Sequence, residues 1–87
     1  MTGQDYYFET ADTNIGAWLL TNKIPFRGAV LSKDGYTSFQ FKPDERITEL
    51  IDDFNAGAEC SAKDFSANYR FLNGQIKQAR RNGGGAL

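Results

Sequence analysis

The chain has 87 residues, of which 24% are charged and 14% aromatic, and its formal net charge is −1 at pH 7. This length gives one small domain with a modest core, which self-association would help to stabilise. Because the charges nearly balance, the protein has no overall electrostatic attraction to nucleic acid or to membranes. Histidine is absent and Cys60 is the only cysteine. This composition excludes histidine-based catalysis, the usual zinc sites and an internal disulfide, so we expect a non-enzymatic protein without a cofactor.

No segment of the sequence resembles a membrane span or a secretory leader. The longest uncharged apolar run, residues 17–20, is far too short to cross a bilayer. The N-terminus lacks the basic-then-apolar order of a signal peptide, and Thr2 stands where N-myristoylation requires glycine. We therefore expect a cytoplasmic protein with no membrane partner, and a lone cysteine is consistent with a reducing compartment.

The first part of the chain predicts a strand followed by a helix. After a loose start over residues 1–5, the aromatic and β-branched segment Tyr6–Thr10 is typical of a short strand. Asp12 can cap a helix that begins at Thr13 and ends near Asn22. A glycine inside this helix weakens it by about 1 kcal/mol relative to alanine, so tertiary packing must hold it. The predicted core face of the helix is Ile15, Trp18 and Leu19.

Residues 26–32 and 36–42 predict a β-hairpin joined by a two-residue type I′ turn at Asp34-Gly35. This turn would pair Val30 with Phe39. One further loop residue would place Val30 opposite Ser38 and mix the apolar and polar faces, so we prefer the two-residue turn. The predicted core face is then Phe26, Val30, Phe39 and Phe41, and the outer face is Arg27, Ala29, Leu31, Ser38, Gln40 and Lys42.

Two further helices follow the hairpin. An apolar pattern at i, i+3, i+4 and i+7 predicts a helix that begins at Pro43 or Asp44 and reaches Ala56, with Gly57 as its C′ stop. Residues 61–64 resemble a capping box, which opens a final helix ending at about residue 81. The core positions of these helices are Ile47, Leu50, Ile51 and Phe54, then Phe65, Tyr69, Leu72, Ile76 and Ala79.

The predicted order of elements is β-α-β-β-α-α. We expect one α+β domain over residues 1–81, with a three-stranded, mainly antiparallel sheet covered by helices on one face. The first strand can lie beside either member of the hairpin. Residues 82–87, which are rich in glycine, are predicted to form a disordered tail.

Charge is segregated between the last two predicted helices. Residues 44–59 carry six acids and one arginine, whereas residues 63–81 carry five bases and one aspartate. The bases could follow a phosphate backbone while an aromatic ring stacks on nucleic-acid bases. Alternatively, they form a solvated face that the acidic helix partly neutralises, within one chain or in a second copy. We prefer this alternative because nucleic-acid modules are usually basic overall. The candidate contacts for nucleic acid are Lys63, Arg70, Lys77, Arg80, Arg81 and Tyr69.

The acidic helix and the cysteine have simple structural interpretations. Glu45, Glu49 and Asp52 share a helix face, but the EF-hand spacing is missing, so we predict no metal site. Cys60 follows Glu59 and has no basic neighbour in sequence to lower its pKa, so we interpret it as a packing residue.

Several apolar residues fall outside the predicted core. Two of them lie about 100° away from the apolar stripes of their helices, and others lie on the outer face of the predicted sheet. They indicate a surface for self-association, of which the symmetric dimer is the commonest form. The candidate interface residues are Leu20, Ala29, Leu31, Tyr36 and Phe71.

Four motifs are similar to those of a known group of proteins: Phe8-x-Thr10-x-Asp12, Ala17-Trp18-Leu19-Leu20, Leu50-x-x-x-Phe54-x-x-Gly57, and a final helix that passes Ile76-Lys77. The span from about Tyr7 to Ala79 resembles an uncharacterised family of short phage and bacterial domains. This resemblance implies a compact intracellular domain and supplies no activity or catalytic residue. Dimeric single-strand-binding transcription cofactors are similar only at the level of fold, because this chain places a helix after its first strand.

These observations predict a small, non-enzymatic protein-interaction domain that forms a homodimer or a higher homo-oligomer, and the resemblance implies that it is phage-encoded. The alternative is a regulator that binds single-stranded nucleic acid through the basic residues of its last helix.

Overall fold

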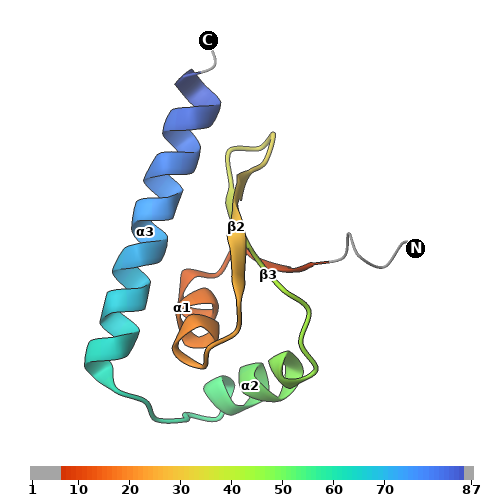
Figure 1. Ribbon diagram of the computed structural model, residues 1–87, viewed down its shortest axis with the longest axis vertical. Helices are drawn as coiled ribbons and strands as arrows, with labels where there is room; N and C mark the ends of the chain where they lie inside the picture. The colour runs from red at the N-terminus through yellow and green to blue at the C-terminus, as the bar shows by residue number, and fades with distance from the viewer. Residues whose placement is uncertain (1–6, 86–87) are drawn as a thin grey trace.

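The computed structural model describes the backbone of residues 7–85 and the side chains of residues 7–82. Its elements follow the predicted order and form an α+β domain (Figure 1). The predicted loose start over residues 1–5 lies outside the described residues. The elements are β1 (Phe8–Thr10), α1 (Thr13–Thr21), β2 (Phe26–Leu31), β3 (Thr37–Phe41), α2 (Arg46–Asn55) and α3 (Ala62–Gly85).

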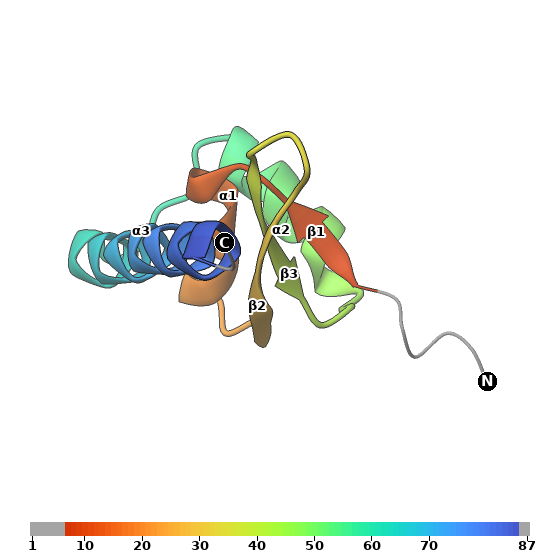
Figure 2. The same cartoon turned by 90° about the horizontal axis from the view of Figure 1, so that it is seen from above.

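The strands form one antiparallel sheet in the order β1-β3-β2. β3 is therefore central, and its Phe39 and Phe41 are fully buried. The position of β1, which the sequence left open, is beside β3, where Phe8 pairs with Phe41. α1 and α3 pack side by side on one face of the sheet, where α3 contacts β2 and α1 contacts β1, and α2 closes the lower end of the molecule (Figures 1 and 2). The helices thus cover one face of the sheet, as predicted.

The hairpin is present, but its predicted turn is wrong. The Ser32 N–H donates to the Tyr36 carbonyl at 2.7 Å, and the Gly35 N–H donates to the Ser32 carbonyl at 3.1 Å. These bonds close a three-residue loop in which Gly35 has a φ of 88°. A type I turn followed by a left-handed glycine has this form. The extra loop residue places Val30 opposite Ser38, the register that the sequence analysis rejected.

A β-bulge explains how this register still separates the two faces. The pairing shifts between Phe26 and Gly28, and Gly28 has a φ of 141° that favours glycine. The extra residue reverses the alternation of β2, so that Phe26 and Ala29 both lie on the core face. Ala29 is paired with Phe39, and Val30 faces outward with 43% of its surface exposed.

α1 begins and packs as the sequence predicts. The Asp12 carboxylate accepts hydrogen bonds from the Asn14 N–H at 2.8 Å and the Ile15 N–H at 3.2 Å, and Trp18 is buried. The role of Gly16 becomes visible only in the fold. A Cβ at this position would lie 2.8 Å from Leu72 Cδ1, so glycine allows α3 to approach α1 closely.

α2 begins at Arg46, later than predicted, because Asp44 caps the helix from outside. The Asp44 carboxylate accepts the Arg46 N–H at 2.8 Å. The predicted stop at Gly57 is confirmed by its φ of 91°. The Gly57 N–H donates to the Phe54 carbonyl at 3.1 Å, and the Ala58 N–H donates to the Asp53 carbonyl at 2.9 Å. This pair of bonds is a Schellman motif.

α3 begins at the predicted cap and ends later than predicted. The Ser61 hydroxyl accepts the Asp64 N–H at 3.2 Å. The helix continues to Gly85 instead of ending near Arg81, so residues 82–85 are helical where a disordered tail was predicted. Residues 86–87 lie outside the described residues. The helix joins a core made of Ala17, Trp18, Leu19, Ile24, Phe39, Phe41, Ile47 and Leu72.

Candidate interaction surfaces

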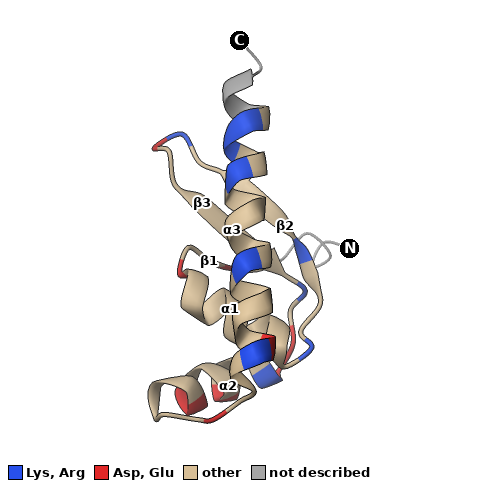
Figure 3. Cartoon of the chain, turned by 90° about the vertical axis from the view of Figure 1, so that its left-hand side faces the viewer, with Lys and Arg blue, Asp and Glu red and all other residues tan. Residues whose placement is uncertain are grey.

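The first candidate surface, which we call the basic stripe, runs along the outer side of α3. Its members recur at spacings of seven, seven and four residues, and each is exposed. At 100° per residue the stripe lies roughly 135° away from the core face of α3, so it points away from the body of the molecule. Figure 3 shows these cations along the length of the helix. The basic stripe consists of Lys63, Arg70, Lys77 and Arg81, and Arg80 is exposed beside it.

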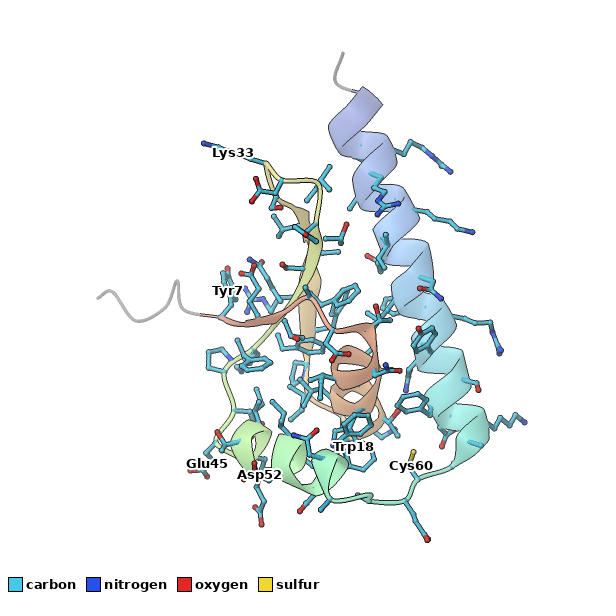
Figure 4. All side chains as sticks on the ribbon, turned by 180° about the vertical axis from the view of Figure 1, so that it is seen from behind. Tyr7, Trp18, Lys33, Glu45, Asp52 and Cys60 are labelled. Carbon is cyan, nitrogen blue, oxygen red and sulfur yellow. The ribbon has the colours of Figure 1, made fainter. Side chains whose placement is uncertain are left out.

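The second surface, which we call the acidic face, is the outer side of α2. Its four carboxylates are exposed, and Figure 4 shows Glu45 and Asp52 directed away from the body of the molecule. α2 approaches α3 through the stacked rings of Phe54 and Phe65, whose centroids lie 6.5 Å apart. These rings lie on the apolar sides of the two helices, so the charged sides are turned elsewhere. The acidic face consists of Glu45, Glu49, Asp52 and Asp53.

The acidic face and the basic stripe form no ion pair within the part of the chain whose side chains are described. The salt bridge found there joins Arg46 Nη2 to Asp44 Oδ2 at 3.0 Å, within two residues at the start of α2. Neutralisation of the basic stripe inside one chain, one of the alternatives left open by the sequence, is therefore not observed.

The Asp44–Arg46 pair has a local role. The Arg46 guanidinium donates to the Asp44 carboxylate from Nε at 3.1 Å and from Nη2 at 3.0 Å. These side-chain bonds, together with the Arg46 backbone N–H, hold the pKa of Asp44 below its ordinary value, and the carboxylate raises the pKa of Arg46. The pair shapes the beginning of α2 and takes Arg46 away from other partners.

The structure separates Tyr69 from the cations with which it was grouped. Its ring is half-buried on the packed side of α3, with its centroid 6.3 Å from that of Phe65. A base stacking on the basic stripe would therefore not reach this ring without displacing it from its packing.

The predicted interface residues lie in different environments. Ala29 and Leu31 are on the core face of β2, so their predicted place on the outer face is wrong, and Leu20 is half-buried against the core. Tyr36 is 68% exposed and Phe71 is 46% exposed. Phe71 also meets its own chain, since its ring centroid lies 5.5 Å from that of Phe26 in an edge-on contact.

The outer face of the sheet carries a small apolar patch that joins Tyr36, a predicted interface residue, to Val30, which the sequence analysis placed on the core face. In the observed register Val30 is opposite Ser38, and Tyr36 lies two residues before Ser38 on β3's side of the hairpin. Val30 and Tyr36 are thus diagonal neighbours, which typically lie about 7–8 Å apart. The signal that could have revealed the outward position of Val30 is the Lys33-Asp34-Gly35 loop, which also suits a three-residue turn. We call Val30 and Tyr36 the outer patch.

Polar contacts surround the outer patch on the same face. The Arg27 guanidinium lies over the ring of Tyr7, 5.2 Å from its centroid. Gln40 Nε2 donates to Glu9 Oε1 at 3.3 Å. No helix among residues 7–85 covers this side of the sheet (Figures 1 and 2), so the outer patch is presented on an open surface.

Cys60 is exposed, so its interpretation as a packing residue is wrong. It lines an open pocket of about 510 Å³ formed by the connector after α2 and the first residues of α3. Within the described residues, no three Cys, Asp or Glu side chains lie close enough together to hold a metal ion. The other residues lining the pocket are Ala58, Glu59, Ala62, Phe65 and Ser66.

No helix of the described chain is long and apolar enough to cross a membrane. Comparisons with protein-family models, with curated proteins and with solved structures find no match to this chain. The resemblance to short phage and bacterial domains therefore stays a prediction.

Proposed function

We propose that the protein is a non-enzymatic binding domain that assembles with further copies of itself. The outer patch is the observation that carries this proposal, because Val30 and Tyr36 are 43% and 68% exposed on an open sheet face. One face of an antiparallel sheet often meets water, but it is then largely polar. Neighbouring exposed apolar side chains on such a face favour a protein contact.

The small size of the core supports the same proposal. Among the side chains that the structure describes, the buried apolar cluster has eight members, which is modest for a chain of 87 residues. Association that removes Val30 and Tyr36 from water adds apolar burial that one copy cannot supply. Fully burying an exposed apolar side chain contributes about 1.5–3 kcal/mol, and the 43% of Val30 and 68% of Tyr36 that are still exposed keep a part of this for an assembly.

Light scattering across micromolar to millimolar concentrations tests this proposal. We expect the wild-type mass to exceed that of a monomer and to rise with concentration. The double substitution Val30→Thr/Tyr36→Ser removes the apolar surface while keeping strand-compatible residues, and it should raise the dissociation constant at least about tenfold. Lys33→Ser in the same loop is the control and should have little effect. A monomeric wild-type protein at millimolar concentration contradicts the proposal.

Binding of single-stranded nucleic acid is the second candidate function. It is favoured by the basic stripe, whose cations are exposed and form no ion pair within the described side chains. Phosphate binding predicts an affinity for oligonucleotides that falls steeply as salt is added. Arg70→Glu/Lys77→Glu should abolish this affinity, and unchanged binding by that variant would reject the candidate. The half-buried ring of Tyr69 makes this function the less favoured of the two.

A further inference from the structure

We infer that the acidic face of α2 in one copy binds the basic stripe of α3 in a second copy. This inference rests on the proposed self-association and identifies one of its contacts. The chain carries opposite charges on separate helices, and among the described side chains these charges form no ion pair with each other.

The segregation of charge is strong for so short a chain. Residues 44–59 have a net charge of −5 and residues 63–81 a net charge of +4, although the whole chain has a net charge of only −1. The acidic face and the basic stripe are exposed, and the ion pair among the described side chains is the local one between Asp44 and Arg46. Each copy therefore offers an acidic face and a basic stripe, and a second copy carries the surface of opposite charge for each of them.

The spacing of the charges on the two helices also matches. Glu45 and Asp52 are seven residues apart, as are Arg70 and Lys77. Seven residues make nearly two helical turns and span about 10.5 Å, so each pair of side chains points the same way. Two helices packed side by side can therefore form two ion pairs at once. Glu49, one turn after Glu45, adds a third carboxylate to the same face.

The contact joins different surfaces on the two copies. The acidic face lies on α2 at one end of the molecule, whereas the basic stripe follows the long axis of α3 (Figures 3 and 4). Two copies that exchange both contacts across a twofold axis form a symmetric dimer, whereas a contact made once between each pair of copies continues into a larger ring or an open chain.

Electrostatics determine how this contact responds to salt. Exposed ion pairs are individually weak, so the charge match selects the partner and its orientation, while the outer patch adds apolar contact. The Debye length falls from about 10 Å at 0.1 M salt to about 3 Å at 1 M. Assembly through the acidic face and the basic stripe should therefore weaken as salt is added.

Charge-swap complementation of the full-length chain tests the inference. One variant, Arg70→Glu/Lys77→Glu, reverses the basic stripe, and the other, Glu45→Lys/Asp52→Lys, reverses the acidic face. Each variant alone should raise the dissociation constant at least about tenfold at 0.1 M salt, measured by sedimentation equilibrium. An equimolar mixture should restore assembly, because each reversed surface then meets an opposite charge. Lys23→Glu/Lys33→Glu changes the net charge equally elsewhere and should leave assembly intact.

The possible outcomes separate the inference from the proposal beneath it. Restored assembly in the mixture supports the inference, provided circular dichroism shows that both variants are folded. A wild-type protein that assembles but does not respond to either reversal overturns the inference and leaves self-association standing. A monomeric wild type overturns both. A monomer that binds a single-stranded oligonucleotide through Arg70 and Lys77 assigns the basic stripe to nucleic acid instead.

Discussion

Gly16 shows how a single residue can favour packing over local helix propensity. A glycine within a helix costs about 1 kcal/mol relative to alanine, and the sequence alone presents it only as a weakness of α1. In the fold, a Cβ there would lie 2.8 Å from Leu72 Cδ1 and 3.3 Å from Phe39 Cδ2. Both neighbours are fully buried, so neither can move aside freely. The glycine is therefore a requirement of the contact between α1, α3 and the sheet.

Gly16→Ala should destabilise the protein by about 1 kcal/mol. Overpacking a core costs roughly 1–3 kcal/mol, and the improved helix propensity returns about 1 kcal/mol of this. Gly74→Ala in α3 is the matched control, because its Cβ would meet no atom within 4 Å. This control should stabilise by up to about 1 kcal/mol. Urea unfolding measures both, and equal shifts in the same direction would refute the packing role of Gly16.

At the scale of elements, periodicity and capping predicted the helices, whereas the hairpin register could not be read from the sequence. The helix signals are local, and Asp12, Ser61 and Gly57 all act as predicted. The hairpin was misjudged because Phe26 and Val30 have the spacing of one strand face. The bulge before Gly28 breaks that alternation, and it depends on a backbone geometry that only the assembled sheet reveals. The predicted register therefore placed Val30 in the core, although Val30 lies on the surface as part of the outer patch.

The start of α2 makes a testable contribution to acid stability. Hydrogen bonds from Arg46 hold the pKa of Asp44 below its ordinary value of 3.8 in the folded state. The folded protein therefore binds fewer protons than the unfolded chain in this range. The resulting stabilisation is present above the ordinary pKa and is lost as the pH falls through the lowered one.

Asp44→Asn keeps a side-chain acceptor for the helix but removes the charge. Its urea midpoint should lie below that of the wild type at pH 7, and the two should converge at acid pH. The difference should also shrink in high salt, because the pair is exposed to solvent. A difference that is constant with pH would mean that the charge of Asp44 does not contribute.

At the scale of the whole molecule, the acidic face, the basic stripe and one small core arise from the same arrangement of helices. The sequence predicted the charge on α2 and α3, but the directions in which those charges face depend on how the helices cross. The separation of Tyr69 from the basic stripe, in contrast, follows from helix periodicity, which already placed Tyr69 among the core positions of the last helix. Local patterns thus predict the side of a helix on which a residue lies, whereas tertiary placement determines which sides of different helices can act together.

Leu72→Ala should be among the most damaging substitutions in the chain. Leu72 is fully buried and joins α3 to α1 and the sheet, and truncating such a leucine typically costs about 2–5 kcal/mol. For a domain of this size each kcal/mol lowers the midpoint by about 4–8 °C, so a fall of more than about 10 °C is expected in a thermal melt. Phe71→Ala, at the adjacent and partly exposed position, should cost clearly less. Equal losses would contradict the assignment of Leu72 to the core.

The fit of Leu72 over Gly16 also sets the angular position of α3 about its own axis. The Leu72 methyl group packs 2.8 Å from the position that a Cβ of residue 16 would take, so α3 lies in this orientation against a bare helix backbone. A rotation by a single residue would swing the cations on the outer side of α3 through about 100°. A substitution that adds side-chain atoms at position 16 would therefore turn the basic stripe of α3 in another direction without changing any charged residue. A buried core residue thus influences the direction in which the basic stripe faces.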